Sequence, residues 1–133
     1  PNLEHVGWAE PKDYPQALNE VRADIMLIPR KDSYFNRCKS NVKFLEASMC
    51  EVPCVAQSFP TGDSPYDLDS KALQLATDML DWKQKVDKLI EEPMIRRELG
   101  RKSKPYVVDN YDIAKNAHKW ESVYDALLLL KAK

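Results

Sequence analysis

Glycine is scarce in this sequence. Only three of its 133 residues are glycine, and these three, Gly7, Gly62 and Gly100, are far apart. A glycine-rich phosphate-binding loop needs several glycines within a few positions, because its backbone must approach the phosphate closely. The sequence therefore excludes such a loop within these residues.

Long apolar segments are also absent, since the longest purely apolar run covers residues 126–130. A helix that crosses a bilayer needs about 20 apolar residues, and the chain does not open with a signal peptide. We therefore expect a cytoplasmic location. Peripheral membrane association of a full-length protein stays open.

Neither sign of charge prevails. Lysine and arginine number 20 and aspartate and glutamate number 21, which gives a formal net charge of −1. Proteins that are attracted as a whole to nucleic acid or anionic lipid carry a clear positive excess. We therefore expect no nucleic acid partner, and any charged ligand must be recognised locally.

Cysteine and histidine are too few and too widely spaced for the common metal sites. The five residues are Cys38, Cys50, Cys54, His5 and His118. Cys50 and Cys54 would flank the boundary between a helix and a strand, and this spacing suits neither a zinc knuckle nor a disulfide framework. The sequence predicts no metal site and buried, reduced thiols.

Short apolar segments alternate with helical patterns along the chain. Residues 23–29, apolar apart from Asp24, form a run that ends at Pro29, as expected of a strand covered on both faces. Further strands are predicted at residues 3–8, 52–58 and 72–76, and helices at 14–22, 78–91, 94–107 and 112–131, with one more helix beginning at Ser40. This order predicts an α/β fold, with a Rossmann-like parallel sheet and flanking helices. At this length, residues 1–133 form a single domain or a fragment of one.

The helix that begins at Ser40 has an unusual first turn. Ser40 is its predicted N-cap, and its predicted buried stripe is Val42, Leu45 and Met49. Lys43 lies where a positive charge opposes the helix dipole, so it needs an anionic partner. Glu46, three residues later on the same face, is one such partner. A phosphate group of a bound ligand is the other.

The segment before this helix is strongly basic. Between residues 30 and 43 there are five basic residues and one acidic residue, a local charge of +4: Arg30, Lys31, Arg37, Lys39 and Lys43 against Asp32. In open α/β sheets, ligands bind beyond the carboxyl ends of the strands, where loops lead into helices. The backbone N–H groups of Asn41, Val42 and Lys43 lack intrahelical acceptors and so favour an anion. Ser40 and Lys43 would then hold phosphate oxygens, and Glu46 would accept hydrogen bonds from sugar hydroxyls.

Several aromatic and histidine residues have simpler structural interpretations. Trp82 and Trp120 lie on apolar helical stripes and are predicted to pack in the core. Tyr66 follows a proline in a turn and is predicted to pack on the domain as a loop aromatic. His118 is predicted to be a surface residue of a helix.

A family resemblance covers nearly the whole sequence. The segments that carry it are ADIMLIP, SNVKFLEASMCEVPCVAQS, SPY, DWKQKVDKLIEEPMIRRELGRKSKPYVVDNYD and HKWESVYDALL, in this order. In this order they resemble the C-terminal half of a group 1 (family 4) glycosyltransferase of the GT-B fold. The resemblance rests on a lysine three residues before a glutamate, a Val-Pro pair opening the next strand, a tryptophan-bearing helix and an Arg-Arg-Glu-Leu stretch.

The resemblance implies a retaining transferase that binds a nucleoside-diphosphate sugar in this domain, without another cofactor. Glu46 matches the second glutamate of the family's two-glutamate motif, which contacts the ribose, and Ser40 and Lys43 match positions around the diphosphate. The implied binding set is Ser40, Asn41, Val42, Lys43, Glu46 and Arg37, while the catalytic residues are unknown. Cys38 stands where the family has its first glutamate. The fold does not rely on a carboxylate-bound metal, and Asp63 and Asp67 do not form a metal pair.

The resemblance also implies missing parts. The family's C-terminal domain opens with strands and a glycine-rich turn that would precede Pro1, and its acceptor-binding domain lies further upstream. We therefore expect a fragment that is inactive alone and that meets a glycan or other acceptor through an absent N-terminal domain. Its last helix is expected to expose an apolar strip around residues 128–130 and to associate weakly with a second copy.

Two other functions stay open. The first is a degenerate GT-B domain that acts as a non-catalytic scaffold or partner-binding module, which Cys38 favours slightly. The second is a sugar-nucleotide epimerase, which shares the architecture but uses carboxylates and a histidine in its cleft.

Overall fold

The computed structural model describes residues 7–131. The strand predicted at residues 3–8 lies mostly outside this range, as does His5. Gly7 and Trp8 have no regular secondary structure.

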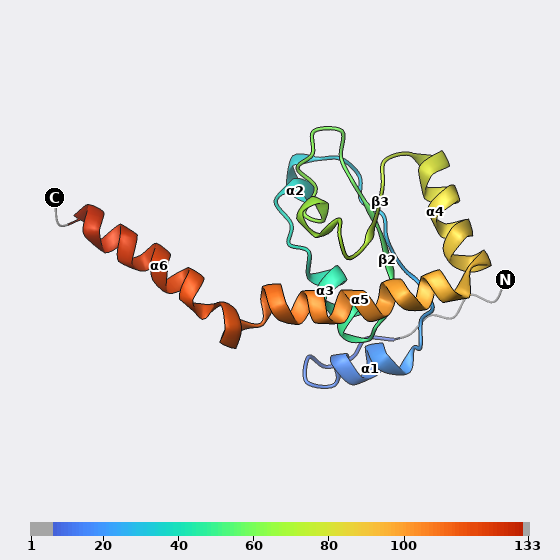
Figure 1. Cartoon of the computed structure of the whole chain (residues 1–133), viewed down its shortest axis with the longest axis horizontal. Coiled ribbons are helices and arrows are strands. Elements are labelled where there is room, and N and C mark those ends of the chain that lie inside the picture. The colour runs from blue at the N-terminus through green and yellow to red at the C-terminus, as the bar shows by residue number, and fades with distance from the viewer. Residues whose placement is uncertain (1–6, 132–133) are drawn as a thin grey trace.

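The sheet has three parallel strands among the described residues, in the order β1-β2-β3. They are β1 (Met26–Ile28), β2 (Cys54–Gln57) and β3 (Gln74–Ala76). In register, Met26 pairs with Cys54, and Val55 pairs with Gln74. Parallel neighbours require crossover connections, and helices lie in the connections from β1 to β2 (Figure 1). The predicted α/β, Rossmann-like fold is confirmed.

The helices flank this sheet. They are α1 (Tyr14–Glu20), α2 (Tyr34–Arg37), α3 (Val42–Met49), the short 3-10 helix η1 (Asp67–Asp69), α4 (Met79–Glu91), α5 (Pro93–Tyr111) and α6 (Ile113–Lys131). The sequence predicted no helix where α2 lies. A helix of four residues is too short to show a helical period, and its N-cap is the hydroxyl of Ser33, which accepts from the N–H of Asn36 at 3.3 Å.

Side chains of β2 divide the core into two clusters. Cys54 and Ala56 face one side, where they meet Phe44 and Ala47 of α3. Val55 faces the other side and packs with Leu89 of α4. This alternation is the two-residue period of a strand. The sheet is therefore covered by α3 on one face and by α4 on the other, while α5 contributes to both clusters.

Two predictions about α3 were wrong. Its N-cap is Asn41 rather than Ser40, and Val42 and Met49 of the predicted stripe are about half exposed. The buried residues are Phe44, Ala47 and Ser48. They also have helical spacing, so the pattern alone could not choose between two faces of the same helix.

Helix α5 runs unbroken through Gly100 and Pro105, two residues that disfavour a helix interior. Pro105 lies inside the helix and removes one backbone hydrogen bond. Gly100 is buried, and a Cβ on it would lie 2.0 Å from the backbone oxygen of Glu51. Glycine here permits α5 to cross directly over the turn between α3 and β2, so it marks close packing rather than a helix end.

Two further predictions of burial failed at the margins of the fold. Leu27 of β1 is 49% exposed, because β1 is an edge strand of the described sheet and one of its faces is open. Trp120 on α6 is 62% exposed. Trp82 on α4 packs against the second core cluster, as predicted.

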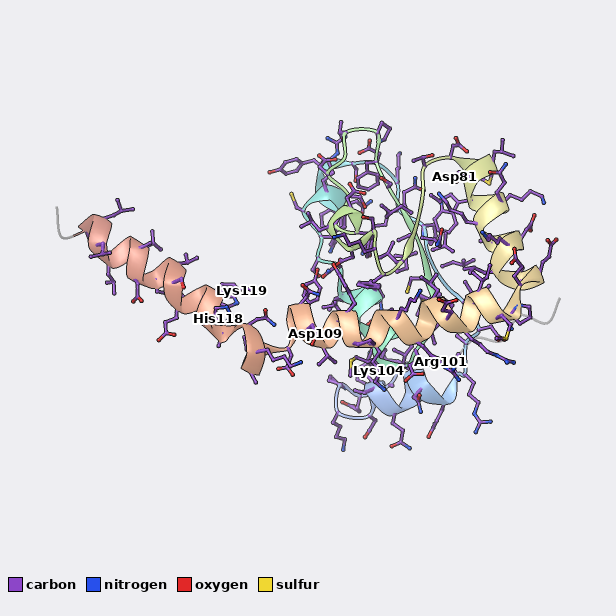
Figure 2. The ribbon with its side chains drawn as sticks, viewed as in Figure 1. Asp81, Arg101, Lys104, Asp109, His118 and Lys119 are labelled. Atoms are coloured by element: carbon purple, nitrogen blue, oxygen red, sulfur yellow. The ribbon has the colours of Figure 1, made fainter. Side chains whose placement is uncertain are left out.

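Helix α6 runs away from the rest of the structure (Figure 1). Among its residues, all of them described, Asn116 near the start is the one that is buried. The strip at Leu128, Leu129 and Leu130 is exposed, as the sequence predicted. His118 also lies exposed on this helix (Figure 2). Self-association through the strip stays a prediction.

Candidate functional site

A basic pocket lies beyond the carboxyl end of β1. Its volume is about 360 Å³, and its lining includes Arg30, Lys31 and Lys43. Asn36 of α2 contributes an amide, and none of the residues that line the pocket is acidic. The pocket is at the edge of the sheet where α/β proteins bind ligands. Its charge suits an anion.

Arg30 is the most firmly held cation of this pocket. Its Nε donates to the hydroxyl of Tyr66 at 3.1 Å, and its Nη1 donates to Oδ1 of Asn36 at 3.3 Å. The guanidinium also lies over the Tyr66 ring, 5.6 Å from the ring centre. Tyr66 is fully buried, so its predicted packing on the domain is confirmed. Among the described residues, no carboxylate forms an ion pair with Arg30.

Lys43 and Glu46 form a cluster with a third residue, Tyr14 of α1. The Lys43 ammonium is 3.4 Å from Oε2 of Glu46 and 3.3 Å from the Tyr14 hydroxyl. The same hydroxyl donates to Oε2 of Glu46 at 3.1 Å. The hydrogen bond with Tyr14 and the charge of Glu46 outweigh partial burial and raise the pKa of Lys43. Lys43 therefore stays charged at neutral pH.

Nothing in the sequence linked Tyr14 to Lys43 and Glu46. It is 32 residues away from Glu46, and only the packing of α1 beside α3 brings the two together. A tyrosine at the start of a helix gives no indication of the carboxylate that it will meet.

An apolar pocket lies on the other side of Glu46. It has a volume of about 480 Å³ and is formed between α1 and α3. Leu18, Leu45 and Met49 line it together with Tyr14 and Glu46. Since Lys43 lines the basic pocket and Glu46 lines the apolar one, this ion pair stands where the two pockets adjoin.

The first turn of α3 offers free backbone donors. The side chain of the N-cap residue, Asn41, makes no capping hydrogen bond. The N–H of Phe44 donates to the carbonyl of Asn41 at 2.8 Å. The N–H groups of Val42 and Lys43 have no backbone or side-chain acceptor within the described residues. Ser40, the residue before the cap, is exposed.

Arg37 has a different environment from the other predicted site residues. Its guanidinium pairs with Asp32 at 2.8 Å and with Asp63 at 3.2 Å. The hydrogen bond with Asp32 is the main cause of the raised pKa of Arg37. Arg37 thus ties α2 to the loop after β2, and it does not line the basic pocket.

The three thiols also differ. Cys54 is buried in the sheet, and burial raises the pKa of its thiol to about 12. Cys50 is partly exposed and Cys38 is exposed, so the prediction of buried thiols holds for Cys54 alone. Cys38 ends α2 and offers no carboxylate at that place.

The acidic residues of the loop after β2 are occupied by structural contacts. Asp63 pairs with Arg37, and Asp67 accepts from the hydroxyl of Ser58 and the N–H of Ser64, both at 2.8 Å. Residues 7–131 contain no cluster of three potential metal ligands. Within the same residues, no helix combines the length and the apolar composition that a membrane crossing requires.

Known protein families include one that matches this chain. A model of the glycosyl transferase-like family matches residues 1–122, which is nearly the whole chain. The chain belongs to the glycosyl transferase-like family. Neither the curated proteins nor the solved structures include a significant match. Membership of the glycosyl transferase-like family gives glycosyl transfer as the class of chemistry, and it agrees with the resemblance seen in the sequence.

Proposed function

We propose that this chain binds a nucleoside-diphosphate sugar as the donor for glycosyl transfer. The observation that carries the proposal is the convergence of Arg30, Lys31 and Lys43 on one pocket beside the open start of α3. A diphosphate carries the charge that three cations and free N–H groups complement. Membership of the glycosyl transferase-like family supports the same ligand.

Three parts of the donor, the diphosphate, the ribose and the base, have a matching surface. The diphosphate accepts hydrogen bonds from the N–H groups of Val42 and Lys43, and its charge is balanced by Lys43 and Arg30. The exposed Ser40 adds a hydroxyl. Glu46 exchanges its contact with Tyr14 for the hydroxyls of the ribose, and the apolar pocket between α1 and α3 receives the base. Arg37 holds the loop after β2 in place through its two ion pairs.

The wider reaction follows from the resemblance. We infer a retaining GT-B enzyme whose acceptor, a glycan or another hydroxyl compound, is bound by an N-terminal domain. The reaction is cytoplasmic and serves glycan biosynthesis. The donor is the substrate, and no further cofactor takes part.

Titration of the 133-residue chain with UDP and GDP, followed by NMR, tests the binding site. We expect the largest amide shifts at Val42 and Lys43, with a dissociation constant near the millimolar range, about 4 kcal/mol of binding free energy. Arg30→Gln should weaken binding. Lys83→Gln, on the exposed face of α4, is the matched control and should leave binding unchanged. Shifts spread evenly over the surface would contradict the proposal.

A second experiment separates the ion pair from the ribose contact. If Glu46 only balances Lys43, Glu46→Gln should affect the binding of UDP and of inorganic pyrophosphate alike. If Glu46 binds ribose hydroxyls, the variant should weaken UDP and leave pyrophosphate, which has no ribose, as tight or tighter. Equal effects on both ligands would remove Glu46 from the site.

The second candidate function is that of a non-catalytic module. The exposed thiol of Cys38 at the position of the family's first glutamate is the observation that favours it. Assay of the full-length protein for transfer and for donor hydrolysis distinguishes the two functions. A protein that binds UDP but turns over no nucleotide sugar, also after Cys38→Glu, would be a module.

A further inference from the structure

Asp69 is a buried carboxylate without a cationic partner. It ends η1 and is fully buried, and among the described residues no lysine, arginine or histidine forms an ion pair with it. Its oxygens accept from three neutral donors: the amide of Asn41 at 2.6 Å, the hydroxyl of Tyr111 at 2.6 Å and the hydroxyl of Tyr106 at 3.1 Å. Burial of a carboxylate is costly even with such partners. Its contact with Asn41 connects it to the start of α3.

Asn41 uses both hydrogens of its side-chain amide in this cluster. One is donated to Oδ2 of Asp69, and the other to the hydroxyl of Tyr111 at 2.8 Å. Tyr111 in turn donates to Oδ1 of Asp69. Partial desolvation of the hydroxyl and this hydrogen bond raise the pKa of Tyr111 well above its usual range, so the hydroxyl keeps the proton that it donates.

This arrangement turns a strong capping residue away from its helix. Asparagine is among the preferred N-cap residues because its side-chain oxygen accepts from the first turn. At the starts of α2 and α4, the N-cap side chains of Ser33 and Asp78 make that bond, with extended backbones. Asn41 has φ −84° and ψ 17°, and its side chain makes no such bond. A capping side chain accepts from the second or third residue of its helix, so the N–H of Lys43, the second residue of α3, is left without this acceptor.

We propose that Asp69 is a positioning residue for the donor site. It holds the side chain of Asn41 and thereby keeps the N–H group of Lys43 open to the diphosphate. The role rests on the proposed function, since it has meaning only if an anion binds at the start of α3. Asp69 itself is buried and does not contact the ligand.

The test uses the 133-residue chain and inorganic pyrophosphate as the probe. In Asp69→Ala, the released Asn41 side chain should accept from the N–H of Lys43, with the Asn41 backbone moving to the extended conformation of Ser33 and Asp78, and so compete with pyrophosphate. We expect affinity to fall about fivefold, which corresponds to a capping interaction of ~1 kcal/mol. In Asp69→Ala/Asn41→Ala the competing side chain is gone, and affinity should return to within about twofold of the wild type. If Asp69→Ala weakened pyrophosphate binding only by disturbing the fold, the added Asn41→Ala would not restore the affinity.

Tyr106→Phe is the matched control, because it removes one hydrogen bond from Asp69 and leaves the contact with Asn41. Its affinity for pyrophosphate should equal that of the wild type. Equal affinity of Asp69→Ala and the wild type, or failure of the double variant to recover, would overturn the positioning role. Absence of pyrophosphate shifts at Val42 and Lys43 in the wild type would instead overturn the proposed function.

A measurement without any variant covers the case in which Asp69→Ala does not fold. Both side-chain amide hydrogens of Asn41 should exchange slowly with solvent in the wild-type chain, since both are donated within the cluster. Exchange as fast as that of Asn19, an asparagine on α1, would overturn the positioning role. Slow exchange supports it.

Discussion

Helices α3 and α4 begin in opposite ways. At α4, Asp78 accepts from the N–H of Asp81 at 2.9 Å, and Asp81 accepts from the N–H of Thr77 at 3.0 Å. Both carboxylates also suit the positive end of the helix dipole. At α3, the cap residue Asn41 makes no capping bond, and Lys43 places a positive charge in the first turn.

The two helix starts therefore differ in capping and charge. Helix α4 begins with a capping bond and two carboxylates, whereas α3 begins with a cation and no capping bond. At α4 the capping bond to Asp81 and the two carboxylates suit the positive end of the helix, so an anion would meet negative charge there. Both helices leave the N–H groups of their first two residues without an acceptor among the described residues, but at α3 these groups lie beside a basic pocket. The stability of α3 must come from packing against the sheet and α5.

The largest effect on the unfolding free energy is expected for Gly100→Ala, which disrupts the packing of α5 on the turn after α3. The new Cβ would overlap the backbone oxygen of Glu51, and backbone cannot move aside as a flexible side chain can. Overpacking of this kind costs up to about 3 kcal/mol of unfolding free energy. Urea denaturation measures the loss, and amide exchange should rise more in α3 than in α4.

Arg101→Ala is the control for this variant, because Arg101 is an exposed neighbour on the same helix (Figure 2). Its effect on the unfolding free energy should stay within about 0.5 kcal/mol. A wild-type unfolding free energy in Gly100→Ala would show that α3 does not depend on close contact with α5.

Asp78→Ala should remove the cap of α4. Loss of an N-cap carboxylate costs ~1 kcal/mol of unfolding free energy, which denaturation would detect. Pyrophosphate binding should be unaffected, since α4 covers the other face of the sheet. A change in pyrophosphate affinity would mean that the two helix starts are coupled.

Lys43→Gln is the reciprocal experiment at α3. The Lys43–Glu46 pair is partly exposed, and the lysine opposes the dipole, so we expect no more than ~0.5 kcal/mol of change in unfolding free energy. Pyrophosphate binding, in contrast, should fall severalfold. A stable variant that binds pyrophosphate normally would show that Lys43 serves only its pair with Glu46.

The smallest effect concerns pH. The hydrogen bond from Lys85, with the N–H of Thr77, lowers the pKa of Asp81. A carboxylate whose pKa is lowered by folding stabilises the fold above its unfolded pKa, near 4, and loses this contribution as pH falls through the folded value. Asp81→Asn should therefore cost about 0.4 kcal/mol at pH 7 and less as the solution is acidified toward pH 2. A difference that does not vary with pH would contradict this origin.

The sequence predicted the positions of helices and strands better than it predicted which of their faces are buried. Apolar runs and caps located the three strands and five of the helices, because these signals are local. The buried face of α3 was missed, since Val42 and Phe44 head equally regular stripes. The close approach of Gly100 to Glu51 was missed because this contact is a tertiary one.

The candidate site shows the same limit. Lys43, Glu46 and the open start of α3 were visible from spacing and charge. Arg30 was predicted as one of the basic residues near the site but not as a site residue. Its position in the pocket depends on its hydrogen bond with Tyr66, which is 36 residues away. Asn41 was chosen for its backbone, whereas the role of its side chain depends on Asp69 and Tyr111, which only the fold brings near.

The fixed position of Arg30 has a thermodynamic consequence for ligand binding. A free arginine side chain loses up to about 2 kcal/mol of rotamer entropy when it is immobilised. Tyr66 and Asn36 already immobilise this one, so that loss occurs during folding. Binding of an anion should consequently show a small entropic penalty at Arg30, and Tyr66→Phe should make the calorimetric entropy of pyrophosphate binding less favourable.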